Sequence, residues 1–328
     1  MVKVGLIGVG WWGKVLARAA ASTGELEVAS VFARTPERRR AAAEELGCRA
    51  AESLEQMLSD PEIEGVMIAT SHRTHADLIE QAASAGKDIF VEKPLAPTVE
   101  EARRAVDAAA KAGVALQVGH QRRRTAAARE MKRLAESGRL GDLQTLQSDH
   151  HVPNGFKMPN EAWRWNPEES PLGSMTSLGI HSIDTFMYLA GPIARVSTFT
   201  RRGRDVTIDE ATGLLFEFES GAVGTLLTSF FVPRLIRLSV HGTGGAAYSD
   251  YDGERLWYQD RDDPAGTEVE LDPVDPVVDQ LREFARVIRD GVTPEVGGEE
   301  GLEVVAVLEA AVASAEQGRA VEVAEYRG

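Results

Sequence analysis

Short apolar runs alternate with helical patterns through the first third of the chain. Runs rich in valine and isoleucine occupy residues 2–7, 26–33, 65–70, 87–91 and 113–118. Between them, apolar residues recur with helical spacing over residues 36–46, 75–85 and 99–111. This alternation is typical of βαβ units, which build a parallel sheet through right-handed crossovers. Residues 1–121 are therefore predicted to form an α/β Rossmann domain.

The pattern changes after residue 121. A helical stretch over 123–137 is followed by runs in which every second residue is apolar, at 144–152, 194–200, 213–219, 222–231 and 235–241. Ser220 and Gly221 fit a hairpin turn between two of these runs. Helical patterns return at 277–289 and 302–317. Residues 122–328 are predicted to form an α+β domain with a large, mostly antiparallel sheet.

Composition narrows the class of protein. The 328 residues, 43% of them hydrophobic, suffice for two domains with their own cores. No apolar run approaches the ~20 residues that cross a bilayer, and a strand begins at the N-terminus, so we expect a soluble, cytoplasmic protein. The single cysteine, Cys48, excludes a disulfide framework, and no metal site is expected. A net charge of -15 argues against nucleic-acid and membrane partners and favours a small-molecule substrate.

A glycine-rich motif lies between the first strand and the first helix. Gly8, Gly10 and Gly13, with Trp11 and Trp12, give the spacing G-x-G-x-x-G in that context. The glycines permit a sharp turn, close approach of a pyrophosphate to backbone N–H groups, and tight packing of the helix on the sheet. The motif predicts a dinucleotide site. Further cofactor contacts are expected where later strands end, at Thr70, Ser71, His75, Glu92, Lys93 and Pro94.

The end of the second strand bears on the choice of cofactor. An acidic residue that binds the ribose 2′-hydroxyl is typical of an NAD site, but Arg34 and Thr35 stand here, with Arg38 one turn into the next helix. A guanidinium suits a 2′-phosphate, so NADP is favoured over NAD, and both remain open. Arg39 and Arg40 are expected on a solvated helix face.

Several residues from position 121 onwards are candidate substrate contacts. His181 and Asp184 lie three residues apart on one face of a predicted helix. In a strand, His150 and His151 point to opposite faces, so one of them can reach substrate. Arg164, flanked by Trp163 and Trp165, fits an anion contact beside a stacking wall, or equally an aromatic sheet edge. The full set of substrate candidates is Gln121, Arg122, His151, Arg164, Ser177 and Asp184, with Arg123 and Arg124 expected in solvent.

Taken together, these residues resemble the Gfo/Idh/MocA family of glucose-fructose oxidoreductases and inositol dehydrogenases. The resemblance rests on the glycine motif, Glu92-Lys93-Pro94 and Gly179 with His181, supported by the following positions: His75, Gly86, Lys87, Leu95, Gly119, Arg123, Gly138, Leu140, Gly141, Trp163, Arg164, Asp184, residues 284–291, Pro294 and Gly301. It implies a Rossmann domain that binds a nicotinamide cofactor and an open-faced sheet domain, with substrate between the two. It also implies that Lys93 binds the reacting oxygen and that His181 is the acid and base.

One position departs from the family pattern. The family usually has aspartate four residues before the histidine, and this chain has Ser177. A serine stabilises a cationic imidazole only weakly, so Asp184 or Asp149 is a possible substitute. The sequence predicts an NAD(P)-dependent oxidoreductase that acts on a secondary alcohol or ketone of a sugar or polyol and assembles as a homo-oligomer, a dimer or tetramer. An NAD-assisted glycosidase and a noncatalytic dinucleotide-binding protein are the alternatives.

Overall fold

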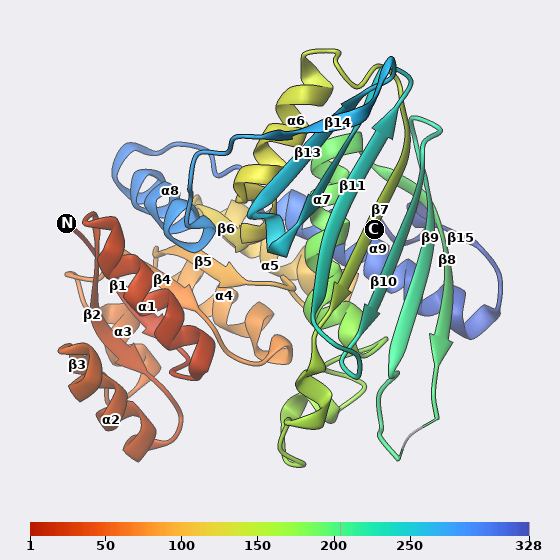
Figure 1. The fold of residues 1–328 in the computed structure, drawn as a ribbon. Coiled ribbons are helices and arrows are strands. Elements are labelled where there is room, and N and C mark those ends of the chain that lie inside the picture. Colours follow the sequence, from red (N-terminus) through yellow and green to blue (C-terminus); the bar gives the residue numbers. More distant parts are fainter. Residues whose placement is uncertain (204, 328) are drawn as a thin grey trace. The chain divides into compact units, whose positions relative to one another are not determined.

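The computed structural model describes residues 1–203 and 205–327 and divides into two compact units (Figure 1). The first unit comprises Met1–Gln121 and Asp275–Val305. The second comprises Arg122–Val274 and Ala306–Gly328. Within the described residues, no helix combines the length and apolar character that crossing a membrane requires.

A six-stranded parallel sheet forms the centre of the first unit. Its spatial order is β3-β2-β1-β4-β5-β6, and every pairing in it is parallel. The order reverses direction at β1 and β4, which places a topological switch point at their carboxyl ends. This arrangement confirms the predicted Rossmann fold. The strands are β1 (Val2–Ile7), β2 (Leu26–Phe32), β3 (Arg49–Ala50), β4 (Gly65–Ile68), β5 (Asp88–Glu92) and β6 (Leu116–Gly119).

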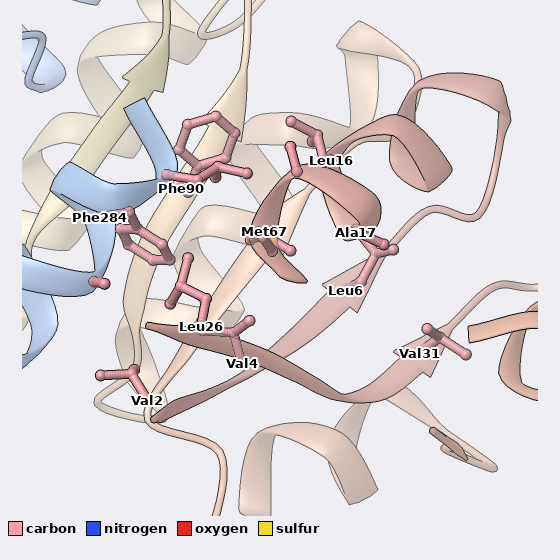
Figure 2. Packing of buried hydrophobic residues seen from close by; sticks show 14 of the residues in the cluster. Val2, Val4, Leu6, Leu16, Ala17, Leu26, Val31, Met67, Phe90 and Phe284 are labelled. Carbon is pink, nitrogen blue, oxygen red and sulfur yellow. The ribbon is translucent and has the colours of Figure 1, made fainter. Parts of the chain in front are cut away.

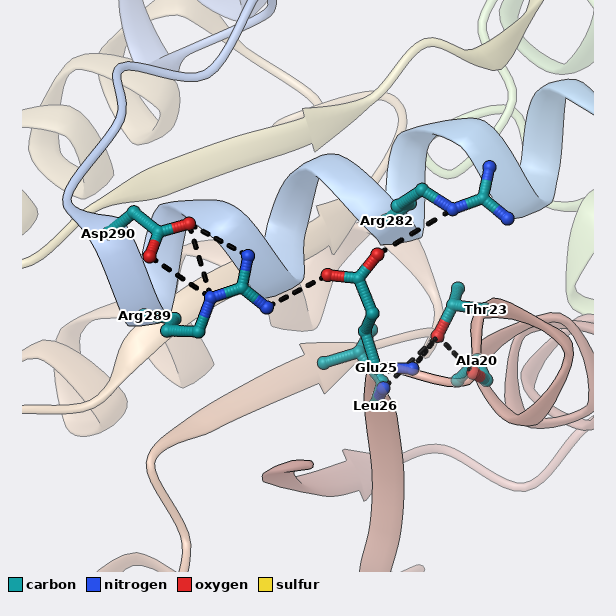
Figure 3. Close-up of polar contacts among 7 residues, drawn as sticks. All are labelled: Ala20, Thr23, Glu25, Leu26, Arg282, Arg289 and Asp290. Atoms are coloured by element: carbon teal, nitrogen blue, oxygen red, sulfur yellow. Dashed lines mark hydrogen bonds and ion pairs between the residues drawn. The ribbon is translucent and has the colours of Figure 1, made fainter.

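Helices follow these strands along the chain. They are α1 (Trp11–Thr23), α2 (Pro36–Leu46), α3 (Leu54–Ser59), α4 (His75–Ser84) and α5 (Val99–Ala112), and the unit also contains α8 (Pro276–Asp290). Helix α8 joins the core around β1 and β2, where the rings of Phe284 and Phe90 lie 5.8 Å apart in one hydrophobic cluster with residues of both strands (Figure 2). Glu25, immediately before β2, pairs with both Arg282 and Arg289 of α8 (Figure 3). Packing and charge together therefore hold this distant segment to the N-terminal strands.

The second unit is built on a nine-stranded sheet of order β14-β13-β12-β11-β7-β10-β9-β8-β15. Only the β7 and β10 pair is parallel, so the predicted mostly antiparallel sheet is confirmed. The strands are β7 (Leu143–His151), β8 (Ile193–Arg201), β9 (Ala211–Phe218), β10 (Val223–Ser229), β11 (Leu235–Gly242), β12 (Gly245–Asp250), β13 (Arg255–Asp260), β14 (Asp263–Val269) and β15 (Val321–Glu322). Its helices are α6 (Ala126–Glu136), α7 (Ile180–Ala190) and the second half of α9 (Gly298–Gln317).

The two faces of this sheet differ sharply in burial. Leu214 and Phe216 on β9 and Leu226 on β10 are buried, whereas Leu215 and Leu227 beside them are about half exposed, at 47% and 52%. Alternation along a strand assigns the buried residues to one face and the exposed ones to the other. We call the exposed face the outer face. It also carries the exposed Phe199 and Val223.

Candidate functional site

The glycine motif forms a tight connection from β1 to α1. Gly8 has φ +99, and a Cβ there would lie 2.4 Å from the Ala69 carbonyl oxygen. A Cβ on Gly13 would lie 2.1 Å from the carbonyl oxygen of Gly8. Both positions therefore require glycine for the turn itself. The loop ends at the switch point, beside the strand end from which Ala69 donates its N–H to Ile7.

Gly10 serves a different purpose. A Cβ on this residue would meet no atom within 4 Å, and its φ of -68 is open to any residue. It caps α1 without a side-chain hydrogen bond, and the first turn of the helix contains no acidic residue. The N–H groups of that turn thus face open space with the positive end of the helix dipole behind them. These features fit a pyrophosphate, and the large exposed ring of Trp11 borders the same turn.

The residues that follow β4 lie across the switch point from this loop. Thr70 and Ser71 are half-buried, and the Thr70 hydroxyl lies 2.7 Å from that of Thr74. The Thr74 hydroxyl in turn donates to the Ser71 carbonyl at 2.8 Å. The turn is therefore fixed by its own hydroxyls, with polar groups next to the glycine motif.

At the end of β2, Arg34, Thr35 and Arg38 are exposed. Within the described residues, neither arginine forms an ion pair. Thr35 caps α2 without using its hydroxyl. Two guanidinium groups, a hydroxyl and a helix N-terminus thus remain available to an anion.

Arg39 corrects the expectation of a solvated helix face. The residue is only 5% exposed. Its guanidinium donates to the backbone carbonyl of Glu52 at 3.1 Å and to the Glu52 carboxylate at 2.9 Å, and it lies over the ring of Phe32. Burial here is compatible with charge because both terminal nitrogens of the guanidinium donate to Glu52 and its carboxylate balances the charge. Arg39 is a structural brace for the end of β2.

The Glu92-Lys93-Pro94 turn is anchored from α4. His75 is fully buried and its Nδ1 lies 2.8 Å from the Pro94 carbonyl oxygen, so the ring donates a hydrogen bond to this turn. Burial is the largest of the effects on this ring and lowers the pKa of His75 to about 4, which keeps the imidazole neutral. Lys93 is half-buried at the same turn. His75 therefore acts on the position of Lys93 through the backbone, rather than as an acid.

Glu92 is an unusual carboxyl group. Burial raises the pKa of Glu92 to about 7, against the lowering effects of Lys93 and the indole of Trp12. A Cβ on Gly119 would lie 2.9 Å from its Oε1, so the end of β6 must be glycine to admit the side chain. The carboxyl group is thus poised to exchange a proton near neutral pH, next to Lys93.

In the second unit, His181 stands in the first turn of α7. A short π-helical segment, Met175–Gly179, precedes it, and such segments interrupt the regular helix geometry. Gly179 is tightly packed, since a Cβ there would lie 2.1 Å from the Met175 sulfur. His181 and Ser177 are both buried, at 6% and 9% exposure. The sequence-predicted histidine and the unexpected serine thus belong to one local structure.

A small cavity of about 40 Å³ lies against His181. His150, from β7, lines it too, and the two imidazole rings stack with centroids 6.3 Å apart and planes inclined by 28°. Ser148 and Ser182 line it as well, and their hydroxyl oxygens are 2.9 Å apart. The cavity wall thus combines two imidazoles with two hydroxyls.

On β7, His150 lines the cavity and His151 does not. His151 points to the other face, where its Nε2 lies 3.4 Å from Asp149. The signal for the correct choice was in the sequence, since Leu146 is apolar and shares its face with residues 148 and 150. The same alternation removes Asp149 as a partner of His181.

Asp184 also has another role than expected. It is fully buried and forms a bidentate ion pair with Arg123, with N–O distances of 2.6 and 2.9 Å. This pair corrects both the predicted substrate contact of Asp184 and the solvated position of Arg123. Arg124, expected in solvent, is also buried at 3% exposure. The Arg123 and Asp184 pair joins the start of the second unit to α7.

The remaining substrate candidates lie in different surroundings. Arg122 lines the cavity of His181 and forms an ion pair with Asp252, which Arg234 also contacts. Arg164 lies 4.2 Å from the ring centroid of Trp163, and burial lowers the pKa of its guanidinium. Gln121, in the first unit, is a buried amide at the end of β6.

Comparison with known families identifies the fold. The model of the oxidoreductase family with an NAD-binding Rossmann fold, GFO/IDH/MocA, matches residues 2–120, and the GFO/IDH/MocA C-terminal domain matches residues 128–248. The chain belongs to the Gfo/Idh/MocA family. As a member of this family it is an oxidoreductase with an NAD-binding Rossmann domain.

Similar proteins of this family act on sugars. The chain is 29% identical to the 1,5-anhydro-D-fructose reductase of Ensifer adhaerens, over 90% of this chain and 91% of the relative. It is 29% identical to D-xylose 1-dehydrogenase (NADP(+)) 2 of Haloferax volcanii, over 97% and 98%. A crystal structure provisionally assigned as an NADPH-dependent oxidoreductase from Desulfitobacterium hafniense has 31% identity and a TM-score of 0.95, and covers 100% of this chain and 99% of its own.

Proposed function

We propose that this Gfo/Idh/MocA enzyme transfers a hydride between a nicotinamide cofactor and a secondary alcohol or ketone of a sugar, polyol or related compound. The observation that supports this proposal most is the open space at Gly10 before the uncapped N-terminus of α1, in a chain of this family. Sugar-active relatives support the substrate class. A nicotinamide, when bound, supplies the acceptor or donor of the hydride.

The chain's own residues handle the oxygen and the proton. When an alcohol becomes a ketone, its carbon loses a hydride and its hydroxyl loses a proton. We assign the binding of the oxygen to the Lys93 ammonium group, which stabilises developing negative charge. We assign the proton to His181, which returns it when the reaction runs towards the alcohol. His75 holds the Lys93 turn, and Glu92 supplies a carboxyl that exchanges protons near neutrality.

A noncatalytic dinucleotide-binding role is the second candidate, and Ser177 favours it because the usual carboxylate is missing from the turn before His181. Turnover separates the two. The oxidoreductase reduces its cofactor when mixed with members of a panel of sugars and polyols, whereas a binding protein does not. Release of an aglycone from a glycoside without net change of the cofactor would instead establish the glycosidase activity.

NADP(H) should bind more tightly than NAD(H). We propose that Arg34, Thr35 and Arg38 hold the 2′-phosphate, because they are exposed at the end of β2 and α2 begins there. Arg34→Ala should remove much of the preference, since a charge-assisted contact is worth about 1.5–3 kcal/mol, or roughly tenfold to a hundredfold in affinity. Titrations of both cofactors measure this. Arg40→Ala is the control, because Arg40 pairs with Glu37. Equal or stronger binding of NAD(H) by the unmodified enzyme contradicts the assignment.

The outer face of the second sheet should be covered by another copy of the chain. Phe199, Leu215, Val223 and Leu227 leave this face broadly apolar, and such patches are rare on monomers. Light scattering should therefore give at least twice the mass of one chain, and Val223→Asp should lower it. Val292→Asp is a matched control, because Val292 is equally exposed, at 40% against 41%, but belongs to the first unit. A monomer at all concentrations would refute this arrangement.

A further inference from the structure

The cavity beside His181 has an excess of basic groups. Its lining contains two arginines and two histidines. Within the described lining residues, Asp252 is the single acid. Arg237, one of the two arginines, has its own carboxylate partner, Asp250, at 3.3 Å. Arg122 is different, because it shares its partner.

Asp252 serves two arginines at once. Arg122 forms an ion pair with this carboxylate, and Arg234 contacts its Oδ2. Two guanidinium groups carry two positive charges and about ten N–H donors, whereas one carboxylate carries one negative charge and accepts about four hydrogen bonds. The cluster therefore retains a positive charge and unused donors. We call Arg122, Arg234 and Asp252 the arginine pair site.

Burial strengthens the attraction of the uncompensated positive charge for an anion. The side chains of Arg122 and Asp252 are only 24% and 25% exposed, so solvent screens them less than it screens surface pairs. Burial, followed by the repulsion of Arg234, lowers the pKa of Arg122 to about 10, which still leaves it a cation at neutral pH. An added anion would relieve the repulsion between the two guanidinium groups.

The cavity beside His181 has room for a small polar group. Its volume of about 40 Å³ exceeds the space that one water molecule needs, so the oxygens of a carboxylate or a phosphate can enter. His181, Arg122 and Asp252 line the same space, and Arg234 lies behind it in contact with Asp252. A substituent bound there would therefore be part of a molecule that also meets His181.

We propose that the substrate of this enzyme carries an anionic group, a carboxylate or a phosphate, which Arg122 binds in the cavity beside His181 while the neighbouring Arg234 occupies Asp252 and adds positive charge. This inference rests on the proposed function, because it names the substrate class of the same site. A sugar acid and a sugar phosphate present the same chemistry to the guanidinium group of Arg122, since both offer several oxygens for bidentate hydrogen bonds.

The test is calorimetric titration of the cofactor-loaded enzyme with D-glucuronate, D-galacturonate and D-glucose 6-phosphate, each against its neutral parent sugar. At least one anion should bind about tenfold or more tightly than its parent, with an advantage that decreases as salt is added. Tighter binding of the two uronates indicates a carboxylate site, and tighter binding of D-glucose 6-phosphate indicates a phosphate site. Equal binding of neutral and anionic sugars, or binding of no anion at all, overturns the proposal.

Three variants and a control separate anion binding from a structural role. Arg122→Gln should abolish the preference, and Arg122→Lys should keep part of it. Asp252→Asn should strengthen anion binding, because it removes the competing carboxylate. Arg103→Gln, which breaks an ion pair with Glu299 within the first unit, should change nothing. If Asp252→Asn weakens anion binding as much as Arg122→Gln does, the cluster is only structural. If the enzyme still oxidises neutral sugars in that case, only the anion-binding proposal fails and the proposed hydride transfer stands.

Discussion

Lys93→Ala and His181→Ala should each lower kcat roughly a hundredfold or more, while cofactor affinity changes little. General acid–base assistance typically contributes ~10²–10⁴ to a rate, and both groups are assigned to the reacting oxygen and its proton. Steady-state kinetics on a verified substrate, beside cofactor titration, measures the effect. Lys111→Ala is the control, since this lysine lies exposed at the end of α5.

Substitution of Ser177 should change the pH dependence of the step assigned to His181. Ser177→Asp restores the usual residue of the family, and a nearby negative charge favours the imidazolium form. The limb of the pH–rate profile that depends on His181 should therefore move to higher pH in this variant. Full turnover by His181→Ala would show that the histidine is structural and that Lys93 or another group carries the proton.

Gly10→Val should abolish dinucleotide binding in an otherwise folded protein. The valine side chain would occupy the open space before α1, where we place the pyrophosphate. Loss of two backbone contacts to a charged group, at about 1.5–3 kcal/mol each, lowers affinity by more than roughly a hundredfold. Because nothing lies within 4 Å of the added Cβ, the melting temperature should change by only a few degrees.

Gly13→Ala provides the contrast. Its Cβ would lie 2.1 Å from the carbonyl oxygen of Gly8, so this variant should lose stability as well as affinity. Cofactor titration and thermal melts on the two variants separate the roles of the glycines. Unchanged affinity in folded Gly10→Val would mean that this loop is only a turn.

Local patterns predicted the architecture because its main elements have strong periodicity. The strands and helices of the first unit follow regular alternation, and Ser220-Gly221 marked the hairpin between β9 and β10. The short strands β12, β13 and β14 were not expected, since residues such as Gly245 and Asp250 have little strand preference. The π-helical turn before His181 also lacks a sequence signal.

The site was predictable where chemistry is local and not where partners are distant. The glycine motif and the Glu92-Lys93-Pro94 turn could be located from neighbouring residues alone. The pair of Arg122 with Asp252 joins residues 130 positions apart, so only the folded sheet brings them together. The burial of Arg39 was likewise not predictable, because its partner Glu52 follows β3 and lies 13 residues away in the sequence. Burial of a charged side chain can be predicted only when the partner that balances its charge is known.

Hydride transfer can be observed as reduction of the bound cofactor. The unmodified enzyme, loaded with NADP, is mixed with a panel of sugars, polyols and sugar acids while the absorbance of reduced nicotinamide is followed. At least one compound should reduce the cofactor, and Lys93→Ala and His181→Ala should each lose this activity. Tight cofactor binding without reduction by any alcohol, and without oxidation of the reduced cofactor by the corresponding ketones, would contradict the proposed hydride transfer.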